Sequence, residues 1–172
     1  MKRRISPVLR PGAAFILAAL LCGCAGYRLG SSLPPGIRSV YVPAFINESG
    51  EPLLETGTTA AVIEELHRDG TLEIKSSSEA DAVLKVTLAD YRLVPLRYED
   101  ERPKTAEEYR AVITARMNLK NRKTGRLLYD TSVSGETTFT VSGDLRSAKR
   151  AALPGAAEDL ARKIVDKTVE YW

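Results

Sequence analysis

The sequence predicts an α+β fold in which two helices cover one face of a mostly antiparallel sheet of four to five strands. Apolar and polar residues alternate over 109–120 and again over 127–133, the pattern of a hairpin with one face in water. Apolar residues recur at helical spacing over 54–66 and over 153–172. With 172 residues, 44% of them hydrophobic and 27% charged, the chain suits one such domain and is too apolar to be disordered.

The first 23 residues have the order of a secretory signal peptide. Residues 1–12 are basic and contain no acid, and residues 13–21 are nine consecutive apolar residues. Nine helical residues reach only ~14 Å, well short of the ~30 Å hydrocarbon core of a bilayer. We therefore expect this apolar segment to be the core of a signal peptide rather than a membrane span.

The stretch Leu21-Cys22-Gly23-Cys24 resembles the bacterial lipobox, with leucine at −3, a small residue at −1 and cysteine at +1. Cleavage before Cys22 would place the bulky Leu21 at −1, so we expect Cys24 to be the residue that carries diacylglycerol and fatty acids such as palmitate. Two or three acyl chains hold a protein to a membrane without a spanning segment. Ala25 follows the cysteine, and the lipoprotein sorting rule that this resemblance implies then favours the outer membrane.

The mature chain divides into a tether and one domain. Residues 24–38 are rich in Gly, Ser and Pro and predict a lipidated tether, leaving 39–172 as a single α+β domain. Residues 39–45 alternate and are rich in β-branched and aromatic residues, which predicts a strand that Pro43 ends or places at an edge. A turn cluster at 47–52 leads into the first helix.

That helix begins near Leu54 and should end at Asp69-Gly70. A short strand is predicted over 71–75 and a long one over 82–95, where a phase change near Ala89-Asp90 indicates a bulge or a switch of buried face. Residues 97–108 are highly charged and contain a proline, and we expect a solvated loop there.

The hairpin and the second helix complete the domain. Residues 121–125 supply the turn after the strand 109–120, and the return strand runs towards Val141. Because Pro154-Gly155 should break or start a helix, we expect the main helical segment to run from about Gly155 to the C-terminus.

Composition excludes several functional classes. Four of the 25 basic residues lie among the first ten, and without them 21 basic residues face 22 acidic ones, so the basic balance gives no reason to expect nucleic acid as a partner. His67 is the single histidine and no cysteine follows Cys24, which argues against a metal centre or a disulfide framework. No set of acid, base and nucleophile converges, so we expect neither an enzyme nor a cofactor.

Two stretches carry a family resemblance. Residues 24–29 (CAGYRL) and 37–49 (IRSVYVPAFINES), together with the element order that follows, resemble the lipopolysaccharide-assembly lipoproteins of the LptE family. The resemblance implies a non-enzymatic lipoprotein on the periplasmic face of the outer membrane, which plugs an LptD-like β-barrel and assists lipopolysaccharide assembly at the cell surface. A strand of this type followed by a helix also occurs in lipoproteins that activate peptidoglycan synthases, which is the alternative function.

One segment of the domain is strongly basic. Between Glu108 and Asp130 there are six cations and no acid: Arg110, Arg116, Lys120, Arg122, Lys123 and Arg126. Phosphates and acidic sugars of a lipopolysaccharide head group would be attracted by such charges. Arg116, Lys120, Arg122 and Lys123 are therefore the candidate lipopolysaccharide-binding residues. The alternative is a solvated sheet face whose charges discourage edge pairing.

Overall fold

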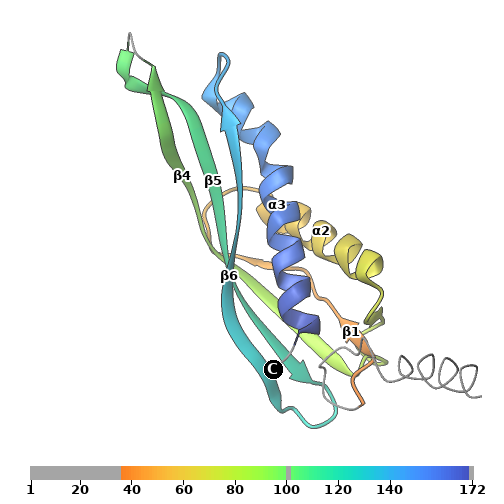
Figure 1. Cartoon of the computed structure of the whole chain (residues 1–172). Coiled ribbons are helices and arrows are strands. Elements are labelled where there is room, and N and C mark those ends of the chain that lie inside the picture. The colour runs from red at the N-terminus through yellow and green to blue at the C-terminus, as the bar shows by residue number, and fades with distance from the viewer. Residues whose placement is uncertain (1–35, 100–101, 171–172) are drawn as a thin grey trace, which may run out of the picture. The chain divides into compact units, whose positions relative to one another are not determined.

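The computed structural model describes residues 36–99 and 102–170, which form a sheet with two helices on one of its faces (Figure 1). The expected α+β class is confirmed. Cys24, the expected signal peptide and most of the expected tether lie outside the described residues. The elements in chain order are β1 (Ser39–Tyr41), β2 (Ile46–Asn47), α2 (Leu54–Asp69), β3 (Glu73–Ile74), β4 (Ala82–Glu99), β5 (Arg102–Asn121), β6 (Leu127–Thr140) and α3 (Leu145–Val169).

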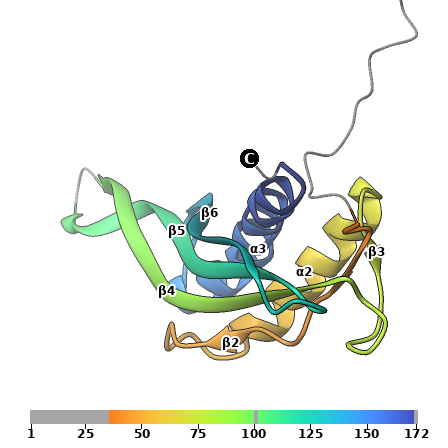
Figure 2. The ribbon, with the colours of Figure 1, turned by 90° about the horizontal axis from the view of Figure 1, so that it is seen from below.

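The sheet has the strand order β3-β1-β4-β5-β6, and β2 pairs with β4 beyond β1. The long strands β4, β5 and β6 are antiparallel, whereas the short β1, β2 and β3 pair in parallel. The sheet therefore has six strands rather than four to five. The extra strand is β2, which follows the expected strand 39–45. Within that stretch only β1 is strand, and Pro43, which has no N–H for a ladder, lies between β1 and β2. Figure 2 shows the long strands curving beneath the two helices.

The prediction of a loop over 97–108 is wrong, because β4 continues to Glu99 and β5 begins at Arg102. Charged side chains at the two ends of this segment, Arg97, Glu107 and Glu108, pair across the two strands. The Nε of Arg97 lies 3.2 Å from Oε2 of Glu107 and 4.0 Å from Oε2 of Glu108. Opposite charges on facing strands stabilise a pair of strands, so a charged stretch can be strand when both of its faces are solvated.

The prediction that the second helix begins near Gly155 is also wrong, since α3 is continuous from Leu145 through Pro154 to Val169. A proline inside a helix costs about 3 kcal/mol or more. Two features offset this cost. The carboxylate of Asp144 accepts a hydrogen bond from the backbone N–H of Ser147 at 2.9 Å and so caps the helix. The helix also packs closely beside the proline, where a Cβ added to Gly155 would lie 3.0 Å from Oγ1 of Thr137.

The core lies between the helices and the face of the sheet that they cover. The predicted bulge is confirmed, because the pairing register of β4 with β5 shifts between Leu88 and Asp90. The expected apolar stripes of both helices supply the buried side chains on their side, and α2 ends as expected at Gly70. The large, fully buried side chains include Val62, Leu66, Leu84, Leu88, Ile113, Met117, Leu119, Leu160 and Ile164.

Helix α3 sits directly on β6 at Gly135. A Cβ at this position would lie 2.3 Å from the backbone nitrogen of Leu160, so only glycine fits. On either side of Gly135, side chains of α3 bind the outer edge of the strand. The carboxylate of Asp159 accepts the backbone N–H of Glu136 at 2.9 Å, and the Nζ of Lys163 donates to the carbonyl of Ser134 at 2.8 Å. The helix thus covers part of an edge strand that would otherwise be open to pairing.

We predict that Gly135→Ala destabilises the fold by about 1–3 kcal/mol, because the added methyl group forces α3 away from β6. Urea unfolding of the purified variant measures the change. Gly57→Ala in α2 is the matched control, since a Cβ there meets no atom within 4 Å. Alanine is the better helix former by about 1 kcal/mol, so the control should keep or raise the stability. Equal stabilities of the two variants would contradict the close contact.

Candidate functional site

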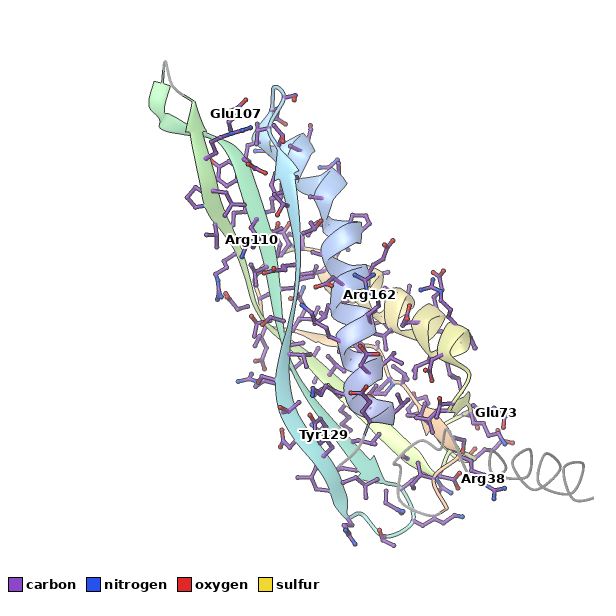
Figure 3. All side chains as sticks on the ribbon, in the orientation of Figure 1. Arg38, Glu73, Glu107, Arg110, Tyr129 and Arg162 are labelled. Carbon is purple, nitrogen blue, oxygen red and sulfur yellow. The ribbon has the colours of Figure 1, made fainter. Side chains whose placement is uncertain are left out.

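The six cations of the basic segment occupy two places. Odd-numbered residues of β5 are buried against the helices, so the even-numbered Arg110, Arg116 and Lys120 lie on the outer face of the sheet. Arg110 is labelled in Figure 3, and its Nη1 lies 3.6 Å from Oε2 of Glu136 on β6. The other three cations, Arg122, Lys123 and Arg126, belong to the turn between β5 and β6.

On the outer face, Arg116 pairs with an acid from another part of the chain. Its Nη2 forms an ion pair with Oε2 of Glu48, which lies in the connection between β2 and α2. Both side chains are more than half exposed, so the pair is screened by water and salt and a stronger anion can compete for the guanidinium. Lys120, also exposed, forms no ion pair with any described residue.

The turn is held against the start of β4. The side-chain oxygen of Asn121 accepts the backbone N–H groups of Lys123 and Thr124 at 2.9 and 3.0 Å, which fixes the shape of the turn. The Nε of Arg122 donates to the carbonyl of Ala80 at 2.5 Å, and its backbone N–H donates to the carbonyl of Asp81 at 2.8 Å. The side chain of Arg122 thus helps to hold the turn against the segment that precedes β4.

Asp81 links this turn to the first strand. Its carboxylate accepts the hydroxyl of Ser39 at 2.8 Å and the backbone N–H of Arg38 at 3.2 Å, and the Nζ of Lys123 lies 3.6 Å away. The Ser39 hydroxyl, then the Arg38 N–H and the Lys123 ammonium, hold the pKa of Asp81 below its usual value. Arg38 and Tyr129 mark this end of the molecule in Figure 3.

The four candidate residues therefore differ in how far their side chains are already bound by other residues of the chain. Arg122 and Lys123 bind the β3–β4 connection, Arg116 has an exposed acidic partner, and Lys120 has none among residues 36–99 and 102–170. Sequence reasoning missed the partners Glu48 and Asp81, because both lie outside the window 108–130 in which the charges were counted. The parallel pairing of β2 with β4 brings Glu48 to the hairpin, and the antiparallel pairing of β4 with β5, in which Ala82 faces Asn121, brings Asp81 there.

His67 is exposed in the last turn of α2. Within residues 36–99 and 102–170, no cluster of His, Cys, Asp and Glu could hold a metal ion. None of the helices in the same residues has the length and hydrophobicity needed to cross a membrane.

Comparison with known families gives a match over most of the chain. The model of the lipopolysaccharide-assembly family LptE matches residues 37–168, which include all six strands and nearly all of α3. No curated protein matches the chain in sequence.

Solved structures share the fold at low sequence identity. The hypothetical protein CT253 from Chlamydia trachomatis superposes with a TM-score of 0.55 and 12% identity, over 78% of this chain and 97% of that one. The minor lipoprotein from Acinetobacter baumannii has a TM-score of 0.52 and 9% identity, with coverages of 77% and 92%. The uncharacterized lipoprotein B from Nitrosomonas europaea has a TM-score of 0.52 and 13% identity, with coverages of 84% and 86%. These similarities establish the fold.

We predict that Asp81→Asn lowers the free energy of unfolding by about 1 kcal/mol at neutral pH, because hydrogen bonds to the carboxylate are weakened. The folded-state pKa of Asp81 is lowered, so its contribution is present above the usual pKa of 3.8 and is lost as the pH falls through the lowered value. The difference between the wild type and the variant should therefore shrink below pH 3.8 in urea unfolding at several pH values.

Asp130→Asn is the control for this effect. Asp130 is exposed on β6 and takes part in none of the side-chain contacts described above. The free energy of unfolding of the variant should therefore equal that of the wild type at every pH. A loss of stability in Asp81→Asn that does not vary with pH would contradict the role of the carboxylate charge.

Proposed function

The chain belongs to the lipopolysaccharide-assembly family LptE, and from this membership we propose that it is an outer-membrane lipoprotein that binds an LptD-like β-barrel and assists lipopolysaccharide assembly at the cell surface. The match over residues 37–168 carries the proposal, because it covers both helices and the whole sheet rather than one motif. The proposed role is one of binding, without catalysis. Nothing in the comparisons favours the alternative of activating a peptidoglycan synthase.

Membrane attachment is part of this proposal. Cys24, which lies outside the described residues, would carry the lipid after removal of residues 1–23. Ala25 favours the outer membrane, and membership of the family favours its periplasmic face. The similarity in fold to lipoproteins from two other bacteria supports this assignment.

The proposed contact with lipopolysaccharide is the outer face of the hairpin. Arg116 and Lys120 are four residues apart on β5. Because side chains of a strand alternate between its two faces, both lie on the same face, and both are exposed. Guanidinium and ammonium groups form charge-assisted hydrogen bonds with phosphates, and an exposed pair such as Arg116 with Glu48 can be replaced by such a contact. Arg122 and Lys123, which hold the turn, would add positive charge to the same region.

We predict that the full chain, tagged and purified from detergent-solubilised outer membrane, recovers an LptD-like β-barrel. Another tagged outer-membrane lipoprotein, purified in parallel, should not recover it. Mass spectrometry of the recovered proteins provides the measurement. Recovery of a penicillin-binding protein without the barrel would contradict the proposal and support the alternative function.

We also predict that Arg116→Gln combined with Lys120→Gln weakens lipopolysaccharide binding and flattens its dependence on salt. Exposed charge contacts are screened over ~8 Å at physiological ionic strength, so their loss removes much of the salt effect. This pair leaves the contacts of Arg122 and Lys123 intact, and a thermal melt should show an unchanged fold.

The measurement is a titration with purified lipopolysaccharide at two salt concentrations. Arg68→Gln combined with Lys167→Gln is the matched control, since it removes two exposed cations from the helices and gives the same net charge. Equal affinities of the two folded variants for lipopolysaccharide would contradict binding at the outer face and support the alternative of a solvated sheet face.

A further inference from the structure

Two adjoining cavities form a groove where the N-terminal part of α2 meets the N-terminal half of α3. One has a volume of about 330 Å³ and the other of about 710 Å³, and they share the rim residues Leu53, Arg150 and Leu153. We call them together the α2–α3 groove. The smaller cavity lies within the range of about 300–1,000 Å³ that is usual for ligand pockets. Its walls are mostly apolar and include the small side chains of Ala60, Ala61 and Ala157.

Leu53 at this rim is both exposed and strained. Its backbone has φ +61°, in the left-handed region that favours glycine, and it is the one non-glycine residue with positive φ among the described residues. Its side chain is 76% exposed, and as the residue before α2 it makes no side-chain capping bond. Glycine or asparagine would relieve the strain at this position. A large apolar side chain held here in water therefore has no explanation in the stability of the free protein.

The larger cavity is basic. It is lined by Arg146, Lys149 and Arg150, and the acid at the start of α3 is Asp144, whose carboxylate caps the helix. Lys149 is neutralised by an ion pair with Glu51. The guanidinium groups of Arg146 and Arg150 make no ion pair within residues 36–99 and 102–170. Of the acids of the groove, Glu64 and Glu158 line the smaller cavity, and Glu51, which is paired with Lys149, lines the larger one.

An apolar trough that ends at two unpaired guanidinium groups suits an amphiphile with an anionic head. An extended peptide would need partners for its backbone N–H and C=O groups, and beyond their first turns the two helices that form the trough use theirs internally. An acyl chain has no such need. We propose that the α2–α3 groove binds one acyl chain of a phosphate-bearing lipid, with Leu53 packed against the chain and the phosphate between Arg146 and Arg150.

This assignment goes beyond the proposed function, because it places a lipid contact on a surface separate from the basic hairpin. It also stands independently of the barrel. Since β6 leads away from the hairpin turn and α3 begins after β6, the start of α3 lies at the far end of the sheet from Arg122 and Lys123 (Figure 1).

The test uses the full chain in a neutral detergent and a phosphatidic acid whose acyl chain carries a nitroxide spin label near its end. Paramagnetic broadening of NMR methyl signals reports where the label resides. We expect broadening at Ala60, Ala61 and Ala157 and none at the exposed Ala44, which lies outside the groove. A phosphatidylcholine with the same label should broaden the groove signals far less, because its head group is zwitterionic.

Two variants address the two parts of the proposal. Leu53→Gly, and Arg146→Gln combined with Arg150→Gln, should each weaken binding about tenfold or more. Leu53→Gly relieves the backbone strain, so its melting temperature should be unchanged or higher, and lost binding cannot then be attributed to unfolding. Arg68→Gln combined with Lys167→Gln is the control of equal charge and should bind as the wild type does.

Three outcomes would overturn the proposal. They are equal broadening of Ala44 and the groove alanines, equal binding of the two labelled lipids, and wild-type affinity of both groove variants. A fourth would identify a protein as the occupant instead: no broadening at the groove, together with loss of the co-purified β-barrel from Leu53→Gly. Failure at the groove with the barrel still recovered leaves the proposed function standing.

Discussion

The close packing of α3 on β6 at Gly135 determines much of the arrangement of this domain. The backbone of Leu160 lies where a side chain of residue 135 would stand, and Asp159 and Lys163 bind the strand edge on either side. Burial raises the pKa of Asp159, but the hydrogen bonds from Lys163 and from the N–H of Glu136 outweigh this and leave it below its usual value. The strand edge is thus bound by an ionised carboxylate, and α2 in turn packs on α3.

Because α3 returns along the sheet from the far end of β6, the domain presents two basic regions that do not merge. The hairpin carries Arg116 and Lys120 on the outer face, while Arg146 and Arg150 lie beside an apolar groove formed by the helices. Arg116 and Lys120 are exposed on the outer face of the sheet. They can bind the head of an anionic ligand, whereas the groove can also take a hydrocarbon chain.

The sequence allowed the elements with a clear period to be predicted, including α2, the hairpin β5–β6 and the buried stripe of α3. It failed where tertiary contacts oppose a local signal. Arg97 and Glu107 suggested a loop by their charge but face each other across two strands, and Pro154 suggested a helix start but is held inside α3. The candidate cations were found, yet Glu48 and Asp81 could not be assigned to them, because pairing between segments far apart in the chain leaves no periodic pattern in the sequence.

The parallel pairing of β1 with β4 has a consequence for the speed of folding. Ser39 and Asp81, whose side chains join these strands, are 42 residues apart in the chain, and the intervening segment contains all of α2. Hairpin formation between neighbouring strands closes a short loop and takes microseconds, whereas domains dominated by distant contacts fold in milliseconds to seconds. The antiparallel strands can therefore assemble first, and the edge formed by β1 and β3 is completed last. Until then the backbone edge of β4 that pairs with β1 stays open, and an unpaired strand edge makes the chain most vulnerable to aggregation during this interval.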